Sequence, residues 1–289
     1  MISRNHMITA VLTVSILGVG LAGCAGQQSA RGPRDVPGDT HELLNAVLWV
    51  QTSAEYEFAC RQVYRLAERN LDEAMADPGW TAALEQTEDY ADLPPAVILD
   101  SDETVLDNAA FEAMLIEEVK EYNKPLWYAW AEDEVASAVP GSREFLQHAW
   151  DMGVEVFFVT NRDHAIEKPT VRNLQALFGP GVTSENVLTR GEREGWTSDK
   201  SSRRAYVAAG YRILLLIGDD YNDFAYLGEL PPEERNASAR QYSDHWGTKW
   251  IMLPNPMYGG WEQALYRYQR GIPRGEKLKA KYEYLDAAP

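Results

Sequence analysis

Three acidic side chains directly follow an apolar run in the segment AVILDSDETVLDN, residues 96–108. They are Asp100, Asp102 and Glu103. Like charges this close raise one another's pKa values unless a cation or a shared proton relieves them. The segment therefore predicts a site where a metal ion, a basic side chain or a proton neutralises the cluster. Paired carboxylates in such a site can act as nucleophile and as general acid or base.

Polar residues stand in a similar place at further points along the chain, after an apolar run or at the start of a helical stretch. They are Thr160, Asn161, Arg162, Lys200, Asp219 and Asp223. Asp100-Ser101-Asp102-Glu103-Thr104, followed in order by these residues, resembles the four motifs of the haloacid dehalogenase (HAD) superfamily of phosphotransferases, which begin with DxDxT.

This resemblance implies that a phosphate ester is cleaved in two steps. Phosphomonoester hydrolysis is among the slowest reactions known, so a covalent intermediate usefully divides its barrier. Asp100 would attack phosphorus and form an aspartyl-phosphate. Asp102 would protonate the leaving alkoxide and later deprotonate the attacking water, which requires that it start protonated.

A cation must stand between the attacking carboxylate and a phosphate dianion. Mg²⁺ suits this place, because it prefers hard oxygen ligands, takes one or two carboxylates directly and keeps several waters. We expect one Mg²⁺ ion, bound by Asp100 and Asp219, with the backbone carbonyl of Asp102 as a third ligand. Asp223 is expected to be a further ligand or to orient one.

Two side chains are predicted to hold the phosphate oxygens, whose charge must be stabilised through the transition state. They are Thr160 and Lys200. A lysine in the first turn of a helix can instead be solvated, and Arg190, Arg193 or Lys168 would then take its place.

Three segments narrow the resemblance to class C acid phosphatases. They are LWVQTSAEY at 48–56, ILDSDETVLDN at 98–108 and LPNPMYGGWE at 253–262. Members of this family are bacterial surface lipoproteins that dephosphorylate nucleoside monophosphates and related esters, as 5'-nucleotidases do. The likeness implies a mostly helical cap, an aromatic clamp for the substrate's ring and frequent dimers, so a homodimer is an expectation.

Three residues are the predicted substrate contacts. Trp127 and Tyr258 are the clamp candidates, and stacking between them would tolerate different bases because each base has a π-face. Asn161 is the third predicted substrate contact. Asn222, in GDDYNDF, stands where the family often has another acid. This departure predicts weaker metal affinity without loss of activity.

Four apolar runs predict buried parallel strands, and three segments between them predict helices. The strands are 96–99, 154–159, 213–217 and 250–253, and the helices are 142–152, 168–178 and 200–209. Alternating strands and helices indicate a Rossmann-like α/β fold, in which ligands bind beyond the carboxyl ends of the strands. We expect every unusual polar cluster of this sequence to lie at such an end.

The predicted phosphatase domain spans residues 39–289. Its core is expected at about 92–108 and 140–265. Helical periodicity at 39–80 and an insertion rich in acids and aromatics at 109–139 predict a mostly helical cap over the strand ends.

The first 24 residues predict a lipoprotein signal peptide, because an apolar stretch ends in Leu-Ala-Gly-Cys. Cys24 would carry the lipid, and residues 25–38, rich in Gly, Pro and polar side chains, would form a flexible tether. Ala25 does not match an inner-membrane retention signal, which favours the outer membrane in a Gram-negative cell. The other cysteine, Cys60, is predicted to be buried in a helix.

The formal net charge of −17 argues against binding of a nucleic acid polymer, which depends on Lys and Arg. The expected partners are a small phosphate ester and, through the lipid, a membrane. Three rival functions remain open. They are a sugar or other small-metabolite phosphatase on the same core, a phosphomutase, and a noncatalytic surface binding lipoprotein.

Overall fold

The computed structural model describes residues 41–226 and 228–287. The predicted signal peptide, Cys24 and the predicted tether lie outside these residues. In the described part, no helix combines the length and apolar character needed to cross a membrane.

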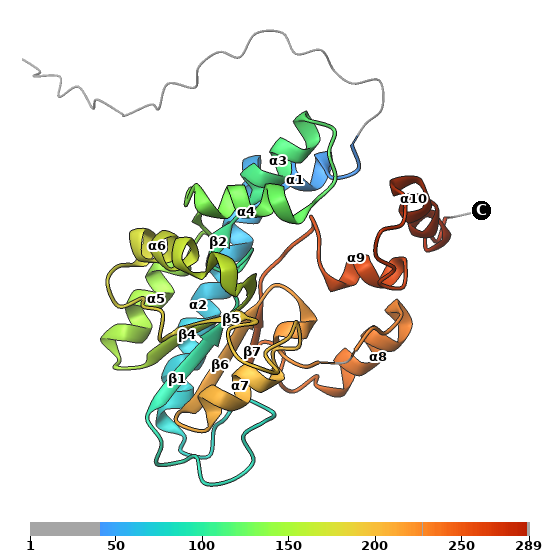
Figure 1. Cartoon of the computed structure of the whole chain (residues 1–289). Helices are drawn as coiled ribbons and strands as arrows, with labels where there is room; N and C mark the ends of the chain where they lie inside the picture. The colour runs from blue at the N-terminus through green and yellow to red at the C-terminus, as the bar shows by residue number, and fades with distance from the viewer. Residues whose placement is uncertain (1–40, 227, 288–289) are drawn as a thin grey trace, which may run out of the picture. The chain divides into compact units, whose positions relative to one another are not determined.

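A five-stranded parallel sheet forms the centre of the described chain (Figure 1). Its strands are β1 (Pro95–Leu99), β4 (Glu155–Asp163), β5 (Val187–Arg190), β6 (Arg212–Gly218) and β7 (Trp250–Met252). Their order is β5-β4-β1-β6-β7, with every pair parallel. The predicted α/β fold is thus confirmed, although the sequence prediction missed β5. This strand is four residues long and lies at an edge, where a long apolar run is not needed.

Alternate residues of β1 fill both faces of the sheet, as the two-residue period of a strand requires. Val97 and Leu99 belong to one core, whereas Ala96 and Ile98 belong to the other. The first core contains residues of α1 (Leu44–Thr52), α2 (Ala54–Ala76), α5 (Ser142–Asp151) and α6 (Glu167–Phe178). The second contains residues of α7 (Ser201–Ala208). Helices therefore cover both faces, as expected for an open parallel sheet.

The N-terminal helical segment is divided at Ser53, whose hydroxyl caps α2 by accepting a hydrogen bond from the Tyr56 backbone N–H at 3.1 Å. The two helices have different neighbours. α2 contacts β6, β7 and α5, whereas α1 contacts α3. The prediction placed all of residues 39–80 in the cap, but α2 packs as a layer against the sheet. Cys60, on α2, is buried as expected.

The insertion at 109–139 begins and ends at a small antiparallel sheet. β2 (Leu106–Asp107) pairs with β3 (Ser137–Ala138), and α3 (Ala109–Glu117) and α4 (Lys124–Glu132) lie between them in sequence. Figure 1 shows these two helices, in green, near α1 and beyond the sheet. Because β2 follows the acidic segment after only two residues, the insertion is fixed close to the carboxyl end of β1.

The C-terminal part adds three helices, α8 (Pro232–Gln241), α9 (Gly260–Leu265) and α10 (Arg274–Glu283). Two short 3-10 turns complete the described elements, η1 (His164–Ile166) and η2 (Tyr221–Asp223). α10 has no buried residue, which agrees with the charged character of its sequence.

Candidate active site

The register of the three central strands brings the predicted motifs together. The last residue of β1 pairs with Phe158 of β4 and with Ile217 of β6. The next residue, Asp100, continues the sheet by donating its backbone N–H to the Ile217 carbonyl at 2.9 Å. Thr160 and Asp219 each lie two residues beyond those partners, so all three residues lie near one edge of the sheet.

Three carboxylates form a cluster at this edge. One oxygen each from Asp100, Asp219 and Asp223 lies within 4.8 Å of the others. The Asp219 carboxylate is held from two sides, by the Thr104 hydroxyl at 3.2 Å and by the Asn255 side-chain amide at 2.8 Å. Such a set of hard oxygen donors suits a divalent metal ion. The sequence prediction gave Asn255 no role, although it lies in the segment that resembles class C phosphatases.

Asp223 reaches the cluster from the 3-10 turn η2. One of its oxygens accepts the Asp220 backbone N–H at 3.0 Å, which closes a capping box. This carboxylate also lies directly against Gly218, where an added Cβ would overlap it. Only glycine therefore fits at the end of β6 with Asp223 in this position.

Lys200 supplies the positive charge for these acids. Its side chain is 4% exposed, and Nζ contacts the Asp100 carboxylate and lies 2.6 Å from Asp223 Oδ1. Burial by itself lowers the pKa of Lys200, but the two carboxylates outweigh this and raise it. Burial raises the pKa of Asp100 to about 7, and Lys200 opposes that rise. Burial and the neighbouring acids also raise the pKa of Asp219 well above its usual value.

The other predicted cations lie in different surroundings. Arg190 lies 3.5 Å from Asp163, and Arg193 lies against the ring of Trp196, 4.8 Å from its centre. Lys200 is the predicted cation that contacts Asp100, and it is buried rather than solvated.

Glu103 is a further buried acid, outside the carboxylate cluster. It is 1% exposed, and burial raises its pKa well above the usual value, with further contributions from Asp102 and Asp219. Its backbone has a φ of 55°, a left-handed conformation that is strained for a residue with a Cβ. Hydrogen bonds from the Asn108 backbone N–H at 2.8 Å and side-chain amide at 3.3 Å hold it there. Glu103 therefore fixes the turn after β1 through its two hydrogen bonds from Asn108.

The Asp102 carboxylate lies outside the three-carboxylate cluster and faces Arg162. Arg162 donates from Nε at 2.9 Å and from Nη2 at 2.8 Å to Asp102 Oδ1, and the Asn108 side-chain amide donates to the same oxygen at 2.9 Å. The sequence prediction included Arg162 in a motif but gave it no role. A strand-end arginine 60 residues from its partner carries no local signal for that contact.

The remaining residues of the second motif are also held tightly. Thr160 is fully buried, and its hydroxyl accepts the Arg162 backbone N–H at 3.1 Å. The Asn161 side chain donates to the Ser198 carbonyl at 3.0 Å and accepts from Arg203 at 2.7 Å. In this structure Asn161 therefore connects the end of β4 to the loop before α7.

The chain is similar to proteins of known family and structure. Residues 22–261 match the family described as HAD superfamily, subfamily IIIB (Acid phosphatase). The chain belongs to this family. Two solved structures of the class C acid phosphatase from Bacillus anthracis are similar to it, and one of them has tungstate bound. Their sequences are 33% and 32% identical to this chain, and the TM-scores are 0.76 and 0.75. Each match covers 86% of this chain and 98% of the Bacillus anthracis chain. The predicted class C acid phosphatase, a phosphomonoesterase, is thereby confirmed.

The predicted clamp residues of this phosphatase lie in different surroundings. Trp127, on α4, makes edge contact with Phe111 at 5.2 Å between ring centres and a tilted contact with Tyr122 at 6.3 Å. Tyr258, in the loop between β7 and α9, is half-buried and packs on the first core. Among the described residues no ring contact joins Trp127 to Tyr258. The clamp therefore stays a prediction.

Asn222 does not belong to the carboxylate cluster of this phosphatase. Its side-chain oxygen accepts a long hydrogen bond of 3.4 Å from Arg235. The adjacent Asp220 accepts from Arg235 at 2.8 Å and from the Gly260 backbone N–H, which joins η2 to α8 and α9. The predicted effect of Asn222 on metal affinity would thus have to act through this surrounding network.

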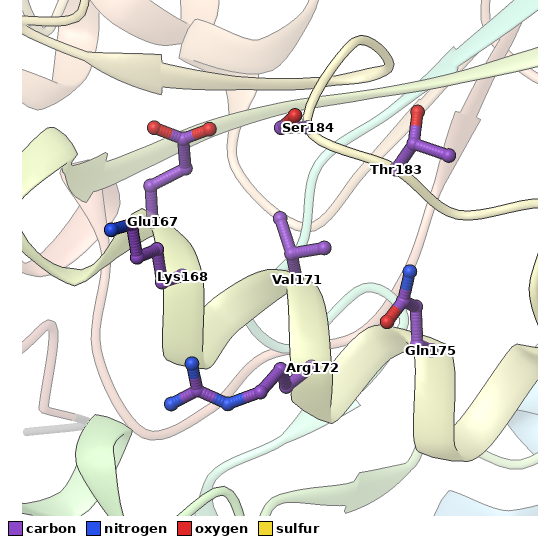
Figure 2. Close-up of a pocket in the computed structure, with 7 residues that line it drawn as sticks. All are labelled: Glu167, Lys168, Val171, Arg172, Gln175, Thr183 and Ser184. Atoms are coloured by element: carbon purple, nitrogen blue, oxygen red, sulfur yellow. The ribbon is translucent and has the colours of Figure 1, made fainter.

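A surface hollow of about 360 Å³ lies between α6 and the loop before β5. Figure 2 shows its lining, with Lys168 and Val171 on the helix and Thr183 and Ser184 on the loop. None of the clustered carboxylates lines it. The hollow therefore is not the phosphatase site, and Lys168 is not placed among the phosphate-binding residues.

Proposed function

We propose that this phosphatase is a Mg²⁺-dependent phosphomonoesterase that forms an aspartyl-phosphate and acts on nucleoside monophosphates and related aromatic phosphate esters. The observation that supports it most directly is the cluster of Asp100, Asp219 and Asp223, in which Asp100 and Asp223 contact the buried Lys200. Such a cluster offers a nucleophile, metal ligands and a phosphate-binding cation within a few ångströms.

The phosphate binds between the carboxylate cluster and the second motif. Lys200 donates to its nonbridging oxygens, and Thr160 borders the same edge of the sheet. Asp100 and Asp219, with Asp223 beside them, would hold Mg²⁺, whose positive charge would offset the repulsion between carboxylate and phosphate. Tungstate, an oxyanion, is bound in one of the similar structures, which supports an oxyanion site here.

The reaction then proceeds in two steps, formation and hydrolysis of the aspartyl-phosphate. A carboxylate oxygen of Asp100 bonds to phosphorus, the bond from phosphorus to the ester oxygen breaks, and Asp102 donates its proton to the departing alkoxide. In the second step Asp102 takes a proton from water, and the water oxygen bonds to phosphorus as the bond from phosphorus to the Asp100 oxygen breaks. Inorganic phosphate leaves, and the Asp100 carboxylate is restored.

Three further proposals rest on the sequence alone. They are lipid attachment at Cys24, an outer-membrane location in a Gram-negative cell, and a homodimer. The substrate class rests on the family likeness and on the aromatic side chains of the insertion, chiefly Trp127.

The test is phosphate release by the protein lacking residues 1–24. Substrates are nucleoside monophosphates, nicotinamide mononucleotide and sugar phosphates, each with added Mg²⁺ and with a chelator. We expect release that the chelator abolishes, that Mg²⁺ restores, and that is fastest on the aromatic nucleotides.

Each other outcome removes a defined part of the proposal. Preference for sugar phosphates would leave the chemistry and exclude the aromatic substrate class. Release that resists chelation would exclude the metal. No release from any ester would favour the noncatalytic binding lipoprotein.

A further inference from the structure

The guanidinium of Arg162 is fully engaged in a buried site. Its side chain is 1% exposed, and all three nitrogens donate hydrogen bonds. Nε and Nη2 both reach Asp102, Nη2 also reaches Asn108 at 3.2 Å, and Nη1 reaches the Thr170 hydroxyl at 3.3 Å. A planar fork held at every nitrogen fixes the plane and direction of the carboxylate that it binds.

The surroundings of Arg162 hold this fork in place from the side of the insertion. The Trp127 ring lies against the guanidinium, 5.1 Å away. Asn108, which contacts both Arg162 and Asp102, is itself held by the Trp130 indole N–H at 3.0 Å. Asp102 is therefore bound to Asn108, just before α3, and to Arg162, which lies against Trp127 of α4. Its carboxylate stands apart from the three clustered acids.

The direction of Asp102 matters for the reaction. When Asp100 attacks phosphorus, the leaving oxygen departs roughly in line on the opposite side. An acid that protonates this oxygen must lie on the side of the leaving group, within hydrogen-bond reach of it. Asp102 is turned toward the insertion, and among the described residues the hydrogen bonds to its carboxylate come from Arg162 and Asn108.

We propose that Arg162 is a positioning residue, which holds the Asp102 carboxylate toward the leaving group of the ester. The inference rests on the proposed two-step function. Arg162 itself touches neither the phosphate-binding lysine nor the clustered acids among the contacts described above. Its effect on catalysis passes through the orientation of Asp102.

The experiment compares two aromatic esters that differ in how much they need an acid. Benzyl phosphate releases a poor leaving alkoxide, whereas 4-nitrophenyl phosphate releases a stable phenolate that needs little protonation. Both carry one ring, so a change in aromatic contacts affects both. The measured quantity is kcat/KM, which reports the steps up to the first release of alcohol and is insensitive to hydrolysis of the phosphoenzyme.

We expect Arg162→Met to lower kcat/KM on benzyl phosphate by about 100-fold or more, the usual size of a general-acid effect. On 4-nitrophenyl phosphate we expect a loss of less than about 10-fold. Arg162→Lys keeps the charge but not the fork, so its loss on benzyl phosphate should be intermediate.

A double-mutant cycle with Asp102→Asn tests whether the two residues act as a unit. If Arg162 acts through Asp102, the double variant Asp102→Asn/Arg162→Met loses little more than Asp102→Asn alone. Arg172→Met is the matched control. Arg172 pairs with Glu134 on the surface, and its loss should leave both esters unaffected.

Three results separate failure of the inference from failure of the proposed function. Equal losses on both esters in properly folded Arg162 variants would overturn the positioning role. Additive losses in the double variant would do the same. A wild-type protein that hydrolyses neither ester would instead overturn the proposed function. Circular dichroism melting of each variant establishes that it is folded.

Discussion

The carboxylate cluster and the aromatic group of the insertion are built in contrasting ways. The aromatic group consists of Phe111, Tyr122, Trp127 and Trp130, which are joined by ring contacts. In the cluster, Asp219 is held from two sides and Asp223 is fixed by a capping box. In the aromatic group, Trp127 is positioned by ring contacts, and its neighbour Tyr122 is 59% exposed. Buried polar groups tolerate few arrangements because each unmade hydrogen bond is costly, whereas ring contacts are individually weak and adaptable. Under the proposed function, the carboxylate cluster determines the reaction, and the aromatic group leaves room for a range of leaving groups.

The replacement Asp100→Asn tests the carboxylate cluster, the more constrained of the two regions. It removes the proposed nucleophile and should lower kcat by at least about 10⁴-fold on every ester. Acid quenching of the wild type during turnover should trap phosphate on the protein, and quenching of the variant should trap none. Asp151→Asn, on the exposed surface of α5, is the control for loss of one carboxylate.

The fold should survive this change. At neutral pH the variant no longer buries the Asp100 charge, so its Tm without metal should equal or exceed that of the wild type. A folded Asp100→Asn protein that still forms the phosphoenzyme would disprove the nucleophile assignment.

The replacement Trp127→Ala tests the aromatic group of the insertion. Loss of one stacking partner is worth about 1–3 kcal/mol, so KM for nucleoside monophosphates should rise by roughly 5- to 150-fold. For ribose 5-phosphate, which has no ring to stack, KM should change by less than about 3-fold. Tyr282→Ala, an exposed aromatic on α10, is the control.

Equal increases in KM on both substrates would contradict a stacking role for Trp127. The residue would then act through packing on Phe111 and Arg162. The contrast between the two regions would be weaker than the geometry suggests.

The sequence predicted the carboxylate cluster better than the aromatic group, for physical reasons. Asp100 and Asp219 directly follow apolar strands, and the parallel register of a sheet necessarily brings such positions together. The partner of Asp102 was missed, because the contact with Arg162 depends on how the ends of β1 and β4 face each other. β5 was missed because an edge strand needs little apolar sequence. The surroundings of Trp127 depend on side-chain packing within the insertion, which leaves no regular pattern in the sequence.

Beside the aromatic group lies a buried acid, Glu112, whose protonation makes the stability of the protein depend on pH. Glu112, next to Phe111 on α3, is 6% exposed, and burial with the nearby Glu262 raises its pKa to about 7. The native protein therefore keeps this proton between about pH 4.5 and 7, whereas the unfolded chain has lost it. Because the native state binds more protons in this window, the contribution of Glu112 to stability falls as pH rises through it and is constant above about pH 7.

Above about pH 7, the replacement Glu112→Gln should therefore raise Tm by a few degrees, and the free energy of unfolding should rise by at most about 3 kcal/mol. Near pH 4 both should be unchanged. Melting curves from pH 4 to 8, recorded with and without Mg²⁺, measure the difference. The gain should not depend on Mg²⁺, because Glu112 is not one of the clustered acids. A gain that disappears when Mg²⁺ is added would place Glu112 in electrostatic contact with the metal site, and the two regions would then have to be treated as one.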